Sequence, residues 1–130
     1  MNIRLNCLYL ISGNPVRLKE FYEKLGLKFT TIKHKVGFDI YRSELGSVLF
    51  EIYPNASAMM DVISNKKIDI MNNPPVRFSF DVDNLEEITK LVPSENFMND
   101  GFYDHDRVFI IDPDGNEFML HQKNKGKISD

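Results

Sequence analysis

Cys7, Glu51, Arg77 and His121 are the side chains in this sequence best suited to chemistry, because each falls in a segment with the composition of a β-strand. A thiol is a candidate nucleophile, a carboxylate a base or metal ligand, an imidazole a base or ligand, and a guanidinium a binder of anions. Cys7 has no histidine near it in the sequence to activate it, so we expect an inert thiol. For His121 we expect an exposed or hydrogen-bonded side chain at a strand end rather than a catalytic base.

The alternation of side chains along a strand decides which residues share a face with these groups. In the first strand Leu8 and Leu10 form the apolar face, so Cys7 and Tyr9 point the other way. The same rule predicts a ligand-binding set of Cys7, Tyr9, Glu51, Tyr53, Arg77, Ser79, Met119 and His121. Tyr9, Tyr41 and Tyr53 are the aromatic side chains that we expect nearest to a ligand.

A β-α-β-β-β unit over about residues 1–53 is expected to hold the first half of this set. Residues 3–11 alternate as a strand, and Asn14 followed by Pro15 predicts the start of a helix that Gly26 ends. Three short strands follow at 27–35, 36–42 and 47–53, with a hairpin turn at 44–47 between the last two.

The same order of elements returns in a second unit over about residues 76–123. A connector at about 54–75, with a short helix at 56–63, separates the two units, and a polar tail covers 124–130. The second unit begins with a strand at 76–82 and a helix that is capped by Asp83 or Asn84 and ended by Pro93. A strand from Phe97, a turn at 99–101, and strands at 104–111 and 117–122 follow.

One such unit makes a curved sheet with a helix on one face and leaves the other face open. We therefore predict an α+β fold in a single domain, residues 1–130, in which two βαβββ modules form a mixed sheet with a cleft and carry their helices on the outer face. The turn at Asp112-Pro113-Asp114-Gly115-Asn116 fits this fold as a structural β-turn.

Composition and charge exclude several classes of function. The 130 residues carry a formal net charge of −3, and the sequence has no basic run with interleaved aromatic residues, so we expect no nucleic-acid partner. We expect no membrane partner, because no run approaches the roughly 18 apolar residues of a membrane span. The single cysteine and the lack of a recognisable secretion signal favour a cytoplasmic protein.

Four segments of the chain resemble the vicinal-oxygen-chelate superfamily, the glyoxalase/bleomycin resistance protein/dioxygenase family. They are FYEKLGL at 21–27, FEIY at 50–53, RFSFDVDN at 77–84 and DPDGNEFML at 112–120. Together they span nearly the whole chain in the order that the family has. The resemblance implies the paired βαβββ fold and a homodimer.

The resemblance also implies where a divalent metal would be held, because metal-dependent members take one ligand from each of four strands. The equivalent positions here are Cys7, Glu51, Arg77 and Met119. Arginine offers only donors and keeps its charge, and methionine is a soft thioether, so neither suits a site of hard oxygen and nitrogen ligands. We expect no metal cofactor. A site of Cys7, Glu51 and His121 would need the imidazole to move by roughly 7 Å along its strand.

Glu51 and Arg77 are expected to come together if the modules pair as they do in the family. Arg77 would then either close the emptied metal position as an ion pair or bind an anionic group of a ligand that Glu51 orients. Both alternatives stay open.

The function that we expect is binding of an unidentified small molecule without a metal, similar to the bleomycin-resistance proteins, rather than catalysis. One alternative is a metal-dependent lyase, dioxygenase or thiol transferase of the same superfamily. The other is a protein that acts through its dimer surface or a regulatory contact, with a vestigial cleft.

Overall fold

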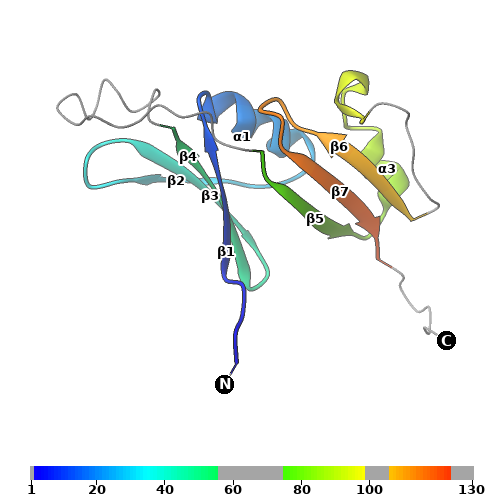
Figure 1. The fold of residues 1–130 in the computed structure, drawn as a ribbon, viewed down its shortest axis with the longest axis horizontal. Helices are drawn as coiled ribbons and strands as arrows, with labels where there is room; N and C mark the ends of the chain where they lie inside the picture. Colours follow the sequence, from blue (N-terminus) through cyan, green and yellow to red (C-terminus); the bar gives the residue numbers. More distant parts are fainter. Residues whose placement is uncertain (1, 56–74, 99–105, 124–130) are drawn as a thin grey trace. The chain divides into compact units, whose positions relative to one another are not determined.

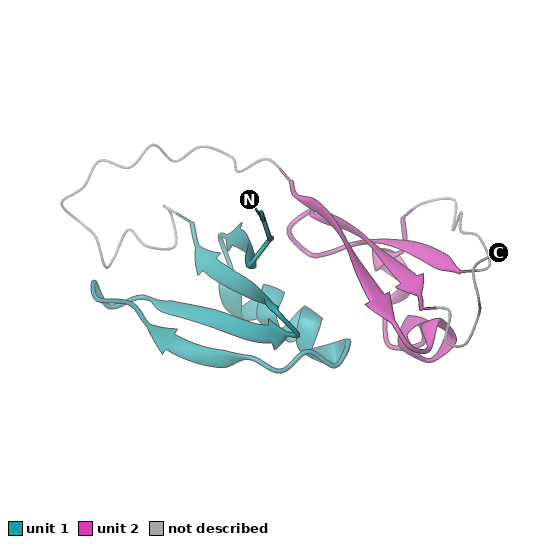
Figure 2. Ribbon diagram, turned by 90° about the horizontal axis from the view of Figure 1, so that it is seen from below, with its two compact units in different colours: residues 1–74 teal, residues 75–130 magenta. Residues whose placement is uncertain are grey.

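The chain divides into two compact units, residues 1–74 and 75–130, in a computed structural model that describes residues 2–55, 75–98 and 106–123 (Figures 1 and 2). The division falls at the end of the predicted connector. The helix predicted at 56–63, the turn at 99–101 and the tail at 124–130 lie outside the described residues. None of the described helices is long and apolar enough to cross a membrane.

The first unit is the predicted βαβββ module. Its elements are β1 (Cys7–Ser12), α1 (Pro15–Lys24), β2 (Thr30–Lys33), β3 (Asp39–Leu45) and β4 (Val48–Pro54). The strands form one sheet in the order β1-β4-β3-β2, in which β1 runs parallel to β4 and the other neighbours are antiparallel. The central place of β4 brings residues of β1 and β3 to both sides of Glu51.

Helix α1 begins and ends where its capping residues predict. The Asn14 side chain accepts a hydrogen bond from the backbone N–H of Arg17 at 3.1 Å, and Pro15 occupies the first turn, where it loses no helical bond. Gly26 follows the helix with a φ of +103°, a conformation that glycine adopts without steric cost. The helix packs against β1 and β4, and the Tyr22 ring meets the Phe50 ring edge-on at 5.0 Å.

The boundaries of β1 and β3 differ from the prediction, and each difference has a local cause. Strand β1 begins at Cys7 rather than Ile3, because its partner β4 begins only at Val48 and leaves the preceding residues without a ladder. The hairpin between β2 and β3 turns at Gly37, whose φ is +103°, and closes with the bond from His34 N–H to Phe38 C=O at 2.8 Å. Strand β3 therefore starts and ends three residues later than predicted.

The second unit has a smaller sheet than predicted within its described residues. Its elements are β5 (Arg77–Val82), α3 (Leu85–Thr89), a 3₁₀ turn η1 (Ser94–Asn96), β6 (Arg107–Ile111) and β7 (Glu117–Gln122). The three strands lie in the order β5-β7-β6, with β5 parallel to β7. Of the strand expected from Phe97, the described residues show one bridge, between Phe97 and Ile110.

The turn between β6 and β7 joins the strands and also holds the start of β5. The Asp112 carboxylate, which is buried, accepts hydrogen bonds from the backbone of Asp114 and from the backbone and side chain of Asn116. The Asn116 side-chain oxygen in turn accepts from the Val76 N–H at 2.9 Å. Gly115 has a φ of +90°, as the turn chemistry predicts.

Candidate functional site

The candidate site lies on the side of the first sheet that faces away from α1. Burial along β1 and β4 confirms the predicted facing, because Leu10, Phe50 and Ile52 are buried on the helix side. Cys7 and Tyr9 of β1, Arg42 of β3, and Glu51 and Tyr53 of β4 lie on the other side. We call these five residues the Glu51 face.

Glu51 is the centre of this face, and its carboxylate is surrounded by donors. The residue is 4% exposed. Its Oε1 accepts hydrogen bonds from the Tyr53 hydroxyl at 3.1 Å and from the Cys7 thiol at 3.6 Å. Its Oε2 forms an ion pair with Arg42 Nε at 2.5 Å. A buried carboxylate is costly unless it is paired and hydrogen-bonded, and these three contacts supply both conditions.

The same contacts fix the protonation of Cys7 and Tyr53. Burial raises the pKa of the Cys7 thiol, and the neighbouring Glu51 charge raises it further. Burial, followed by the hydrogen bond to Glu51, raises the pKa of the Tyr53 hydroxyl. Both groups therefore keep their protons at neutral pH and act as donors. A thiol is a poor nucleophile, which agrees with the expectation of an inert Cys7.

Two tyrosines add an aromatic surface to the Glu51 face. The rings of Tyr9 and Tyr53 lie 5.2 Å apart between centroids and are tilted by 59°. Tyr9 is 54% exposed, although it is a large aromatic residue, so its ring is open to a ligand. Tyr41, which we also expected near a ligand, lies opposite Ile52 on the helix side, where the Lys19 ammonium sits 5.2 Å from its ring centroid.

Arg42 is the functional residue that the sequence interpretation missed. It lies directly opposite Glu51 in the antiparallel pairing of β3 with β4. The turn at Gly46 predicts this pairing of Arg42 with Glu51, because Leu45 pairs with Val48 across a two-residue loop. Arg42 precedes Leu45 by three residues and Glu51 follows Val48 by three residues, which makes them partners.

The predicted site residues of the second unit lie on the side of its sheet that is opposite the phenylalanines. Phe78, Phe80 and Phe118 form an aromatic cluster, with Phe78 stacked on Phe118 at 5.4 Å. Ser79 lies beside Met119 on the other side. Arg77, also on that side, is exposed and pairs with Glu117 across the strands at 2.9 Å. Glu51 and Arg77 thus each have an ion-pair partner within their own unit, and their mutual pair stays a prediction.

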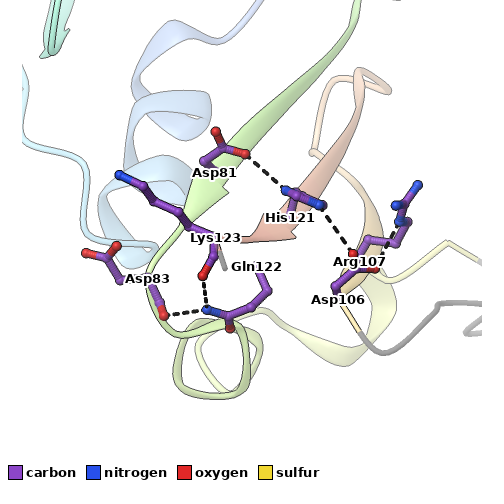
Figure 3. Close-up of polar contacts among 7 residues, drawn as sticks. All are labelled: Asp81, Asp83, Asp106, Arg107, His121, Gln122 and Lys123. Carbon is purple, nitrogen blue, oxygen red and sulfur yellow. Dashed lines mark hydrogen bonds and ion pairs between the residues drawn. The ribbon is translucent and has the colours of Figure 1, made fainter. Parts of the chain in front are cut away.

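His121 joins three segments of the second unit at the end of β7 (Figure 3). Its Nδ1 lies 3.2 Å from an Asp81 carboxylate oxygen on β5, and its Nε2 lies 3.4 Å from an Asp106 oxygen just before β6. The pKa of Asp106 is held below its usual value, and the largest cause is the hydrogen bond from Arg107. The two ring nitrogens diverge toward separate carboxylates, so the three groups do not converge on one point. His121 is therefore a cross-strand link.

The residues at the family's metal positions do not form a fitting ligand set. Glu51 Oε2 is taken by a guanidinium, Arg77 is itself a cation, and Met119 is a thioether. Within the described residues, no group of three or more His, Cys, Asp or Glu side chains is placed to hold a metal ion.

Comparison with solved structures decides the fold. A protein from the mobile metagenome of V. Pseudocholerae aligns over 96% of this chain and 98% of its own, with a TM-score of 0.68 and 18% sequence identity. TnmS3, an antibiotic binding protein from Streptomyces sp. CB03234, aligns over 95% and 98% with a TM-score of 0.63 and 13% identity. Lactoylglutathione lyase from Agrobacterium tumefaciens aligns over 92% of both chains with a TM-score of 0.60 and 16% identity.

This chain shares the fold of these three proteins. The predicted α+β architecture of βαβββ modules is confirmed, and the described residues of the second unit form a sheet of three strands, where four were predicted. No protein-family model and no curated protein sequence matches the chain. At these low identities the fold is what the proteins share, and the neighbours with this fold include both a binding protein and an enzyme.

Proposed function

We propose that this protein binds a small molecule on the Glu51 face and does so without the divalent metal of its fold family. The observation that carries the proposal is the environment of Glu51. At a position where metal-dependent relatives offer a carboxylate to the metal, this carboxylate is buried and already holds a guanidinium, a hydroxyl and a thiol. A metal ion would have to displace Arg42 and leave its charge unpaired.

The open Tyr9 ring supplies what a binding surface needs in place of the metal. An exposed aromatic side chain next to a fixed polar group is typical of sites for small ligands, which combine apolar contact with a few placed polar groups. TnmS3, which shares the fold, is described as an antibiotic binding protein. A planar ligand that stacks on Tyr9 fits this arrangement.

We expect a planar aromatic probe, 2-naphthamide, to bind at Tyr9. With about 13 non-hydrogen atoms at about 0.3 kcal/mol each, its Kd should be about 1 mM. Titration followed by NMR should shift the signals of Tyr9 and Tyr53 and few others. Tyr9→Leu removes the ring contact and should weaken binding by about two- to twelvefold, since stacked rings contribute about 0.5–1.5 kcal/mol beyond the area they bury.

A matched control is Leu91→Ala, which removes another exposed apolar side chain in the second unit. This variant should bind 2-naphthamide like the unchanged protein. If both variants weaken binding equally, the probe adheres to apolar surface in general, and the proposed site on the Glu51 face is wrong.

The protein purified without chelator should contain less than about 0.1 equivalents of Zn, Ni, Fe and Mn by plasma mass spectrometry, because the donor set does not suit these ions. Added Zn²⁺ or Mn²⁺ should leave the melting temperature unchanged, whereas a metal that binds the native state raises it by mass action. One equivalent of tightly held metal would favour the alternative, a metal-dependent lyase, dioxygenase or thiol transferase. A cytoplasmic location and a homodimer remain predictions.

A further inference from the structure

We infer that the ligand of the Glu51 face is a planar aromatic acid, one that carries a carboxylate or phenolate oxygen beside its ring. The inference rests on the proposed function, since it names the chemistry of the molecule that stacks on Tyr9. It follows from which donors and acceptors of the face are already used, and from how the charges of the Arg42–Glu51 pair are exposed.

The strong acceptor of the face is occupied. Both oxygens of the Glu51 carboxylate have partners, and the protons of the Tyr53 hydroxyl and the Cys7 thiol are directed to it. A ligand that offers N–H or O–H groups would have to compete with these contacts inside a buried cluster, where hydrogen bonds to a charged group are stronger than those between neutral groups.

Arg42 has N–H donors that its contact with Glu51 does not use. Within the described residues its contact with Glu51 is made through Nε. A guanidinium has five N–H donors, and four of them are on the terminal nitrogens. The Arg42 side chain is 36% exposed, whereas the Glu51 side chain is 5% exposed. The terminal nitrogens can therefore bind an acceptor oxygen of a ligand without disturbing Glu51.

The ion pair also presents its positive end to the surface. The charges of Glu51 and Arg42 cancel in total, but the carboxylate is covered by three donors, whereas the guanidinium is partly exposed to water. An incoming molecule therefore meets the cation first. Glu44 lies two residues further along β3 on the same side, but it is exposed, so water and salt screen its charge.

The aromatic surface and the donor are connected by direct contacts. The Tyr9 ring lies 5.2 Å from the Tyr53 ring, the Tyr53 hydroxyl binds Glu51, and Glu51 binds Arg42. Tyr9 and Arg42 are both register partners of Glu51 on the strands at either side of β4, so their backbones lie about 10 Å apart. A bicyclic ring that bears an acid group is of about this length. Guanidinium groups pair with carboxylates through two parallel hydrogen bonds, which favours an acid over a neutral carbonyl.

Three matched probes test the inference: 2-naphthoate, 2-naphthamide and 2-naphthylmethylammonium, which differ in charge but share the ring. At low salt 2-naphthoate should bind about fivefold more tightly than the amide, and the ammonium should bind more weakly than the amide. The preference for the acid should shrink as NaCl is raised, because the guanidinium is partly exposed.

Glu51→Gln sharpens the test, because glutamine keeps the size of the side chain and an acceptor oxygen but removes the charge that offsets Arg42. It should raise the preference for 2-naphthoate over 2-naphthamide by a further factor of about three to ten. The ratio of the two Kd values is the readout, because both probes meet the same altered face. An NMR spectrum with the dispersion of the unchanged protein confirms that the variant is folded.

The outcomes separate the two proposals. If none of the probes binds at Tyr9, the proposed function fails. If all three bind there with equal Kd, or the ammonium binds best, the proposed function stands and the preference for an acid is overturned. An unaltered ratio of acid to amide in Glu51→Gln also overturns it.

Discussion

Replacing Arg42 with methionine is expected to lower the free energy of unfolding by about 2–3 kcal/mol. Methionine fills much of the same volume but leaves the buried Glu51 carboxylate without its cation. Breaking a fully buried pair in this way costs about 3–5 kcal/mol, and the partial exposure of Arg42 lets water recover part of that cost. Urea unfolding followed by circular dichroism at neutral pH measures the change.

Two further variants show whether the unpaired charge is the cause. The double variant Arg42→Met with Glu51→Gln should regain most of the lost stability, because the uncompensated charge is then gone. Lys33→Met removes a cation from the exposed Lys33–Asp39 pair of the same sheet and should cost less than about 1 kcal/mol. Equal losses in Arg42→Met and Lys33→Met would contradict the role given to Glu51.

Replacing Asn116 with alanine should lower the free energy of unfolding by about 2–3 kcal/mol. The change takes one donor from the buried Asp112 carboxylate and the acceptor from the Val76 N–H, and unsatisfied buried polar groups cost about 1–3 kcal/mol each. Urea unfolding gives the free energy. Hydrogen exchange gives a local readout, since the Val76 amide should lose its protection.

An asparagine outside such a network provides the comparison. Asn2 is exposed, and Asn2→Ala should change stability by less than about 0.5 kcal/mol. If Asn116→Ala leaves the exchange of the Val76 amide unaltered, the bond that joins the turn to β5 does not contribute in solution.

Local signals in the sequence predicted much of the fold. Asn14, Pro15 and Gly26 bound helix α1 as expected, because capping depends on side chains next to the helix end. The alternation of apolar residues predicted the facing of β1, β4, β5 and β7, because a strand has a period of two wherever one face is buried.

Features that depend on pairing were harder to predict. The start of β1 is decided by where its partner β4 begins. Tyr41, which we expect near a ligand, lies instead on the helix side, because the register of β3 with β4 pairs it with the buried Ile52.

The candidate site was predicted in part for the same reason. Cys7, Tyr9, Glu51 and Tyr53 lie together on one face as the alternation indicates. Arg42 was missed because its importance comes from the register of the hairpin and not from a motif around it. A two-residue loop fixes the register of a hairpin, so the sequence around Gly46 does contain the information that places Arg42 opposite Glu51.

The ion pair between Arg42 and Glu51 also bears on how quickly and how selectively a ligand can bind. A free arginine side chain samples many rotamers, and immobilising such a side chain on binding costs about 0.5–1.5 kcal/mol. Here the carboxylate of the neighbouring strand has already fixed the guanidinium before any ligand arrives. The face is therefore preorganised, and association needs no rearrangement of its polar groups. A molecule with a longer link between its ring and its acid group would not place the acid at the fixed guanidinium of Arg42.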